Sequence, residues 1–251
     1  MTRVIMHGCN GRIGQTISSL LAEDAGMKIV AGIDKIDFGK NAYPVYENIE
    51  ECDLEADVII DFSNANAVDG LLRYATDRKL PVVLCTTGLS EEQLNKVDEA
   101  SKQIPVLRSA NMSLGVNLLM KLVKEAAATL YGAGFDIEIV EKHHRHKLDA
   151  PSGTALALAD AANSGVSENL DYVYDRSTRR EERPVAEIGI SAVRGGSIVG
   201  DHDVIFAGTD EVVTLSHTAY SRSVFAKGAI EAAKFLSDRD PGMYDMSDVI
   251  G

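Results

Sequence analysis

The stretch Val4-Ile-Met-His-Gly-Cys-Asn-Gly-Arg-Ile-Gly14 decides the fold. Its apolar start predicts a buried strand, and its glycines predict a tight turn. The apolar spacing of Ile13, Ile17 and Leu20 then predicts an amphipathic helix. A strand, a glycine turn and a helix in this order are typical of the first unit of a dinucleotide-binding domain.

The glycines of this stretch have separate expected roles. Gly8 makes the tight turn, while Gly11 and Gly14 keep the backbone close to a pyrophosphate and let the helix pack on its sheet. Asn10 stands where a middle glycine is often found. Because asparagine tolerates a left-handed backbone better than most residues, we expect the turn to close with Asn10 in place.

A second strand, Lys28 to Asp34, strengthens this interpretation. Asp34 ends the strand about twenty residues after the turn, where a carboxylate meets the ribose hydroxyls of a bound adenosine. Lys35 follows and is able to pair with a 2′-phosphate. A first βαβ unit that binds no nucleotide is the alternative.

Strands and helices alternate through the next segments of the chain. Strands are expected at 57–62, 81–84 and 105–107, with a helix at 65–78 and a helix cap at Ser90. This order predicts a parallel, doubly wound sheet, which binds ligands at the carboxyl ends of its strands. Three such ends are rich in turn residues, and we expect them to line one cleft: 8–13, 85–88 and 109–113.

The alternation changes near Leu114. A helix at 116–130, a strand at 135–140 and a helix at 152–162 are followed by a loop at 164–184. Strands at 188–193, 203–206 and 212–219 and a helix at 223–236 complete the chain. The predicted fold class is α/β, a Rossmann-type doubly wound parallel sheet plus a second α+β domain with an antiparallel or mixed sheet. The first domain is expected at 1–111 and 223–251, and the second at 112–222.

Composition narrows the class of partner. The 251 residues carry a net charge of −13, which argues against nucleic acid or an anionic membrane as partner. The three cysteines form no CxxC pair, which favours a reducing compartment over a disulfide framework. The N-terminus has no signal-peptide pattern, and no apolar run is long enough to span a membrane.

The stretch Glu141-Lys-His-His-Arg-His-Lys-Leu-Asp-Ala-Pro-Ser-Gly-Thr154 carries the most chemistry. It holds three of the six histidines and two lysines, and it leads into a helix start. Imidazoles move protons near neutral pH, and a helix N-terminus offers amides to an anion. These features predict an acidic small-molecule substrate. A solvated basic loop before a helix is the alternative. The histidine spacing lacks further ligands, so no metal site is expected.

Residues 141–155, EKHHRHKLDAPSGTA, resemble the signature of the dihydrodipicolinate reductase family. The resemblance covers essentially the whole chain and includes GCNGRIG, the CTTG and SANMS turns, AVRGGSIVGDH and the terminal YDMSDV. It implies reduction of a cyclic α,β-unsaturated imine dicarboxylate with NADH or NADPH, in the route to diaminopimelate and lysine. It also implies a cytoplasmic homotetramer assembled through the sheets of the second domain.

The resemblance assigns roles by position. His143 is the implied proton donor and Lys147 its catalytic partner, while His144, Gly153 and Thr154 are the implied substrate contacts. The implied dinucleotide contacts are Gly8, Cys9, Asn10, Gly11, Arg12, Ile13, Asp34, Cys85, Thr86, Thr87, Ser109, Ala110, Asn111 and Met112. The chemistry agrees, because hydride addition to a conjugated imine leaves an electron-rich enamine that must gain a proton. An imidazole delivers such a proton, and an ammonium stabilises negative charge.

Two positions depart from the family pattern, since many members have glycine at Cys85 and phenylalanine at Met112. A methionine covers a ring about as well as an aromatic side chain. Asp34 favours NADH and Lys35 admits NADPH, so both cofactors are expected. Two other functions stay open at this point. One is a dehydrogenase for another acidic imine or keto acid, and the other is a nucleotide-sensing protein without activity.

Overall fold

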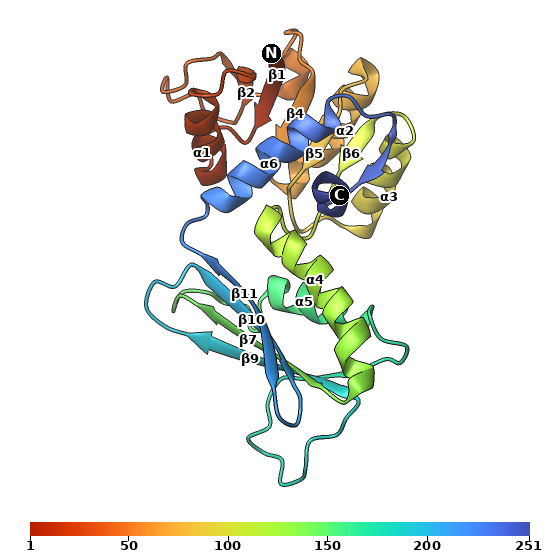
Figure 1. The fold of residues 1–251 in the computed structure, drawn as a ribbon. Coiled ribbons are helices and arrows are strands. Elements are labelled where there is room, and N and C mark those ends of the chain that lie inside the picture. Colours follow the sequence, from red (N-terminus) through yellow and green to blue (C-terminus); the bar gives the residue numbers. More distant parts are fainter. The chain divides into compact units, whose positions relative to one another are not determined.

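The computed structural model describes residues 1–251 and divides them into two compact units. The first unit comprises residues 1–113 and 223–251, and the second comprises residues 114–222. Helix α4 begins at Leu114, so the second unit begins two residues after the position expected from the sequence. The fold class predicted from the sequence is confirmed by the two sheets (Figure 1).

The first unit is built on a seven-stranded parallel sheet with the order β12-β6-β5-β4-β1-β2-β3. Its strands are β1 (Thr2–His7), β2 (Met27–Ile33), β3 (Val45–Tyr46), β4 (Val58–Asp61), β5 (Val82–Leu84), β6 (Pro105–Leu107) and β12 (Gly242–Tyr244). Its helices are α1 (Arg12–Leu21), η1 (Ile49–Glu51), α2 (Ala65–Arg78), α3 (Glu91–Ser101), α6 (Ser223–Leu236) and α7 (Met246–Ile250). The short elements β3, β12 and α7 were not predicted from the sequence.

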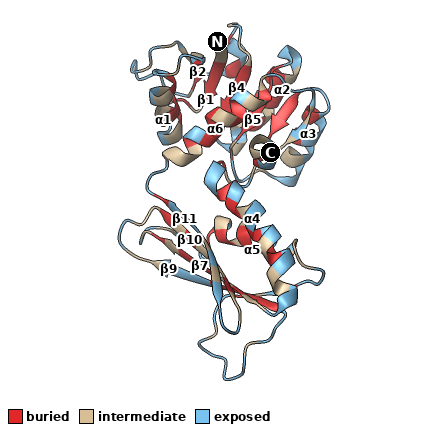
Figure 2. Cartoon of the chain, in the orientation of Figure 1, coloured by how far each residue is buried: buried red, intermediate tan, exposed pale blue.

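Helices cover both faces of this sheet, as the buried residues in Figure 2 indicate. One core packs α1 and α6 on the strands, and a second core packs α2 and α3 on the opposite face. Helix α6 therefore returns to the first unit, as its amphipathic pattern predicted. Ser90 caps α3 with a capping box completed by Gln93, which fixes the start of that helix.

The second unit packs two helices on one face of a five-stranded mixed sheet with the order β11-β10-β7-β9-β8. Its helices are α4 (Leu114–Leu130), η2 (Tyr131–Ala133) and α5 (Gly153–Asn163). Its strands are β7 (Asp136–His143), β8 (Asp171–Val173), β9 (Glu187–Arg194), β10 (Gly200–Ala207) and β11 (Val212–Ala219). Strand β7 extends three residues beyond its predicted end, so Glu141 to His143 belong to the sheet and not to a basic loop.

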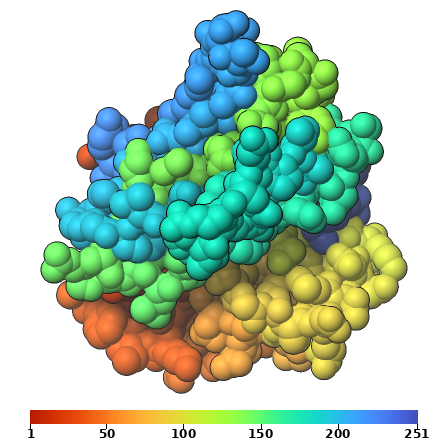
Figure 3. Space-filling view, turned by 90° about the horizontal axis from the view of Figure 1, so that it is seen from below, coloured from red at the N-terminus to blue at the C-terminus, as the bar shows by residue number.

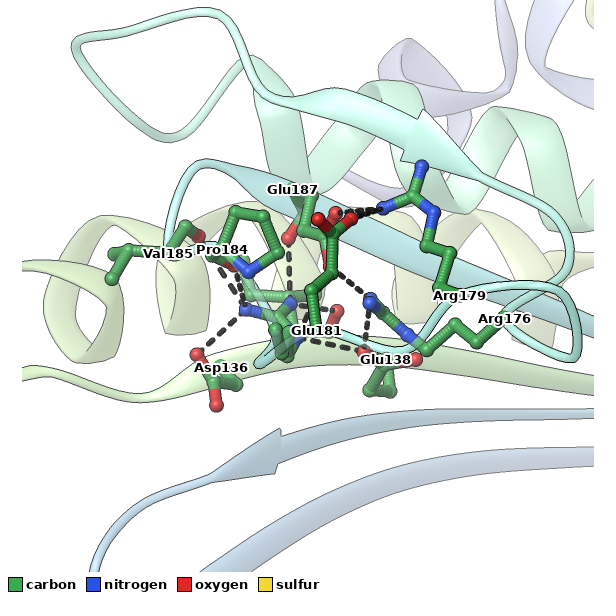
Figure 4. Close-up of polar contacts among 10 residues, drawn as sticks. Asp136, Glu138, Arg176, Arg179, Glu181, Pro184, Val185 and Glu187 are labelled. Carbon is green, nitrogen blue, oxygen red and sulfur yellow. Dashed lines mark hydrogen bonds and ion pairs between the residues drawn. The ribbon is translucent and has the colours of Figure 1, made fainter.

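The segment between α5 and β9 lies on the surface, in teal in Figure 3, and contains the short strand β8 that the sequence did not predict. Three arginines fasten this segment to the sheet. Arg176 and Arg179 reach the buried carboxylate of Glu187, as Figure 4 shows. Arg183 donates from Nε to Glu138 over 2.9 Å and from Nη1 to Asp136 over 2.7 Å.

No helix combines the length and apolar composition that crossing a lipid bilayer requires.

Candidate active site

The glycine turn after β1 is shaped by backbone contacts. Gly8 has φ of +80°, and a Cβ at this position would lie 2.5 Å from the carbonyl oxygen of Phe62. A Cβ at Gly14 would lie 2.3 Å from the carbonyl oxygen of Gly8. Gly11 precedes helix α1 without a side-chain cap, so the first amides of α1 keep their capacity to bind an anion.

Asn10 contributes to the turn in a different way from the one expected. It is not among the residues with positive φ, so its tolerance of a left-handed backbone is not used. Its backbone amide donates to Oδ2 of Asp34 over 2.9 Å, and its side-chain oxygen accepts from Asn41. The other oxygen of Asp34 accepts from the amide of Lys35 over 2.9 Å. The Asp34 carboxylate is therefore fixed beside the turn.

A cavity of about 750 Å³ lies beside this turn, within the size range of cofactor sites. The predicted residues among those that line it are Gly8, Asn10, Gly11, Asp34 and Lys35. Residues after β4 and at the start of α2 line it as well, although they were not predicted from the sequence: Phe62, Ser63, Asn64, Asn66 and Ala67. Because β4 neighbours β1 in a parallel sheet, the carboxyl end of β4 was the signal that could have identified them.

His7, at the end of β1, also lines the cavity. Its Nδ1 lies 2.9 Å from Oδ1 of Asp61, whose carboxylate is fully buried at the end of β4. This pair was not predicted, although both residues directly precede turns at strand ends.

The remaining predicted cofactor residues are not among those that line the cavity. Arg12 and Ile13 begin helix α1 directly after the turn. Cys9 and Met112 are in the core of the first unit, where burial raises the pKa of the Cys9 thiol to about 12. The pKa of Cys85 is also raised by burial, so both thiols are neutral packing groups near pH 7. The turns after β5 and β6 lie on neighbouring strands and are not among the residues that line the cavity, but the hydroxyl of Thr86 lies 3.4 Å from that of Ser63, which does line it. The residues of these turns are Cys85, Thr86, Thr87, Ser109, Ala110 and Asn111.

In the second unit, β7 alternates between its two faces. Ile137 and Ile139 point into the core, and Glu141 and His143 continue the same inward phase. Glu141 has no exposed surface and His143 retains 8%. A charged residue in phase with two buried isoleucines was the signal that could have identified Glu141 from the sequence.

The Glu141 carboxylate accepts hydrogen bonds from three separate parts of the unit. Its Oε2 lies 2.6 Å from Nδ1 of His143. Its Oε1 accepts from the amide of Ser152 over 2.9 Å, and Arg194 of β9 donates to both oxygens over 2.7 Å. The Arg194 and His143 contacts lower the pKa of Glu141 against the opposing effect of its burial. The carboxylate is ionised at neutral pH and satisfied on both oxygens.

His202 of β10 completes the buried polar group. Its Nε2 lies 3.0 Å from the hydroxyl of Ser152, and its ring lies edge-on to His143 with centroids 5.2 Å apart. Burial and the charge of His143 lower the pKa of His202 to about 4. His202 is therefore neutral near pH 7.

Cationic groups surround His144. Its pKa is lowered by desolvation, then by the charges of Arg222, His143 and His146 and of Lys147. Lys147 pairs with Asp149 over 2.9 Å. This positive potential suits an anionic ligand.

The start of helix α5 follows directly. Ser152 caps the helix by accepting from the amide of Ala155 over 3.1 Å. A Cβ built at Gly153 would meet no atom within 4 Å, so the first residue of the helix faces open space. Glu141 accepts from the Ser152 amide, and Gly153 is the exposed first residue of the helix. Gly153 and Thr154 thus stand at an accessible helix N-terminus beside the histidine segment.

Family models of dihydrodipicolinate reductase match both halves of the chain. The model of the N-terminal region covers residues 2–112, and the model of the C-terminal region covers residues 115–250. The chain is 57% identical over its whole length to 4-hydroxy-tetrahydrodipicolinate reductase of Caldanaerobacter subterraneus, with 98% of that protein covered. It is 51% identical, again over its whole length and 98% of the relative, to the protein of the same name from Clostridium novyi.

Solved structures agree with this result. A dipicolinate-bound dihydrodipicolinate reductase from Paenisporosarcina sp. TG-14 has a TM-score of 0.82 and 25% identity, with 98% of this chain and 97% of that chain covered. A probable dehydrogenase from Thermotoga maritima shares the fold, with a TM-score of 0.63 at 13% identity, covering 99% of this chain and 92% of that one. Fold and site thus define a two-unit oxidoreductase with a Rossmann-type sheet. The chain belongs to the dihydrodipicolinate reductase family.

Proposed function

We propose that this chain reduces the cyclic unsaturated imine dicarboxylate of 4-hydroxy-tetrahydrodipicolinate metabolism to tetrahydrodipicolinate, in the route to diaminopimelate and lysine. The carrying observation is the imidazole of His143, which is held by a buried carboxylate in the same unit as the accessible start of α5. Relatives named for this reaction that are more than half identical over the whole chain support the proposal.

The proposed reduction transfers a hydride and a proton, and the two come from different groups. A bound nicotinamide dinucleotide supplies the hydride. His143 then protonates the electron-rich enamine carbon that remains, and Lys147 stabilises negative charge on the substrate or orients it. His202 beside His143 is neutral near pH 7, so it adds no second cation that would attract the substrate carboxylates.

The substrate carboxylates are held by the start of α5 and the neighbouring cations. The Gly153 amide and the Thr154 amide and hydroxyl bind one carboxylate, and His144 contacts the substrate from the cationic segment. A dipicolinate-bound relative supports a dicarboxylate ligand of this kind.

The dinucleotide is held by the glycine turn of the first unit. Gly8 to Ile13 bind its pyrophosphate, and Asp34 accepts hydrogen bonds from the adenosine ribose. The cavity beside the turn and the fixed Asp34 carboxylate fit such a group. The strand-end turns at 85–87 and 109–112 bind the nicotinamide half.

Both nicotinamide cofactors are accepted in this proposal, with NADH used at least as well as NADPH. The Asp34 charge repels a 2′-phosphate, and Lys35 offsets that repulsion only in part because a lysine lacks the fork of an arginine. Asp34→Ala should weaken NADH use and spare NADPH, and Lys35→Ala should do the reverse. The ratio of kcat/KM values for the two cofactors checks this assignment, which is wrong if neither substitution moves the ratio.

We further propose a cytoplasmic homotetramer. One face of the sheet in the second unit carries the two helices α4 and α5, and the other face is available to a second copy. Sedimentation equilibrium measures the assembly, and a monomer at micromolar concentration would contradict it.

Loss of NADH absorbance in the presence of freshly generated cyclic imine tests the proposed reaction directly. A panel of other imines and keto acids is the control. Turnover of the cyclic imine far above the panel is the expected result. Cofactor binding without turnover would instead favour a nucleotide-sensing protein, and turnover of a panel member would favour another dehydrogenase.

A further inference from the structure

Glu141 joins the proton donor to the start of the substrate-binding helix. We propose that Glu141 is a positioning residue. It fixes the His143 imidazole so that Nε2 alone delivers the proton, and it holds this imidazole in place relative to the first residues of α5. The inference rests on the proposed function and extends it to a residue that touches neither substrate nor cofactor.

The burial of this carboxylate is the first observation. An ionised carboxylate without exposed surface is costly unless it is paired and hydrogen-bonded. Glu141 meets that condition through Arg194, His143 and the Ser152 amide. An uncharged residue at this buried position would avoid the free-energy cost of burying a carboxylate, so stability alone does not account for Glu141.

The second observation is which nitrogen of His143 is engaged. Nδ1 lies 2.6 Å from Glu141, so it carries a proton and is not available to the substrate. Nε2 remains as the atom that donates. A Cβ built at Gly200 would lie 3.0 Å from this Nε2, so the chain has its smallest residue where the reactive nitrogen needs room.

The third observation is the link to helix α5. The Ser152 amide bonds to the same carboxylate, and the Ser152 hydroxyl caps the helix and contacts His202. Arg194 donates over 2.7 Å to the carbonyl oxygen of Asp149, which fixes the segment between β7 and α5. One carboxylate thereby sets the imidazole and the helix start relative to each other.

Charges around His143 define how removal of the carboxylate acts. Oε2 of Glu141 lies 2.6 Å from Nδ1 of His143, and Arg194 of β9 pairs with the same carboxylate. His202 of β10 and His217 of β11, both with a pKa lowered by burial, are neutral at pH 7. Replacing Glu141 with a neutral residue removes the negative charge that is in contact with the imidazole.

Glu141→Gln tests this role, with Glu168→Gln as the matched control. Glu168 is an exposed carboxylate of the same unit that accepts from the hydroxyl of Tyr131 over 2.8 Å. Glu141→Gln should lower kcat by roughly tenfold or more, the scale of a charge-assisted hydrogen bond. NADH affinity should stay within about twofold, because the residue belongs to the unit that does not carry the glycine turn.

The pH profile separates positioning from a general structural effect. In Glu141→Gln the limb on which kcat falls with rising pH should move to lower pH by roughly one unit. Glu168→Gln should leave both kcat and that limb near the wild-type values. An unchanged profile in Glu141→Gln, or an equal loss in the control, would overturn the proposal.

Two further measurements do not depend on the folding of Glu141→Gln. Gly200→Ala should lower kcat by roughly tenfold, because its Cβ crowds Nε2, without moving the pH limb. In the wild-type protein, ¹⁵N spectra of labelled histidine should show neutral His143 with its proton on Nδ1. A proton on Nε2 in the neutral form would overturn the inference, whereas absent turnover in the wild-type enzyme would instead overturn the proposed reaction.

Discussion

The glycine turn of the first unit and the histidine segment of the second unit make their sites in opposite ways. The turn depends on the absence of side chains, since a Cβ at Gly8 or Gly14 would clash with neighbouring carbonyl oxygens. The histidine segment depends on specific polar contacts, since one buried carboxylate accepts hydrogen bonds from His143, Ser152 and Arg194.

This difference predicts which changes each region tolerates. Added volume should damage the turn, because backbone atoms cannot move away from a new side chain. A change of charge should damage the histidine segment, because its partners would stay buried without compensation. Substitutions in the turn should mainly lower cofactor affinity, and substitutions in the histidine segment should mainly lower turnover.

The largest expected effect is that of His143→Ala. We expect turnover to fall by roughly 10²-fold or more, the usual contribution of a general acid. NADH affinity, measured by fluorescence titration, should stay near the wild-type value, because His143 belongs to the second unit. Equal turnover in the variant would remove His143 as proton donor, and a parallel loss of NADH affinity would break the separation of the two regions.

Gly8→Ala is the corresponding change in the turn. Its positive φ and the 2.5 Å approach to Phe62 should cost about 2–3 kcal/mol, which weakens NADH binding by roughly 30- to 150-fold. Gly134→Ala is the control, because Gly134 also has positive φ but no atom within 4 Å of its Cβ. If both variants bind NADH as the wild type does, the turn does not depend on backbone approach.

His202 makes stability depend on pH. Its pKa is lowered from 6.5 to about 4 in the folded protein, mainly by burial, so the unfolded chain binds the proton more readily between these values. Stability should therefore fall as pH decreases through this window. Between pH 7 and pH 5 the loss from His202 is roughly 2 kcal/mol.

Denaturant unfolding of His202→Gln at both pH values measures this contribution. The glutamine variant should lose less stability than the wild type on going from pH 7 to pH 5. An equal loss in both proteins would assign the acid sensitivity to other groups.

Thr154→Val removes a single hydroxyl at the start of α5. Loss of one charge-assisted hydrogen bond, about 1.5–3 kcal/mol, should weaken the binding of pyridine-2,6-dicarboxylate by roughly tenfold or more. Calorimetric titration checks this, with Thr129→Val as a control on helix α4, where the hydroxyl only contacts the carbonyl oxygen of Glu125. Equal affinity in Thr154→Val would place the carboxylate elsewhere.

The sequence predicted the elements that have a strong pattern of their own. Helix α2 and strand β11 have the predicted bounds, because apolar periodicity and flanking turn residues agree there. The three-residue strand β6 was predicted from its wholly apolar run before a turn. Strands β3, β8 and β12 were missed, since they are equally short or shorter and have no such apolar run of three residues. They form only because a neighbouring strand offers its free edge.

The site residues divide in the same way. Gly8, Asp34 and His143 were predicted because glycine turns, strand ends and histidine clusters can be recognised from the order of residues in the sequence. The His7–Asp61 pair and the contacts of Arg194 with Glu141 were not, because they join strands that lie far apart in the chain. Sheet order is needed to bring such partners together.

The central claim is that the hydride and the proton come from different regions, with Glu141 acting on the proton donor and the start of α5 but not on the cofactor. The solvent deuterium isotope effect on kcat, compared between the wild type and Glu141→Gln, tests this most directly. The account predicts a larger solvent effect in the variant, because proton delivery becomes more rate-limiting. An unchanged solvent effect together with a lower kcat would contradict it.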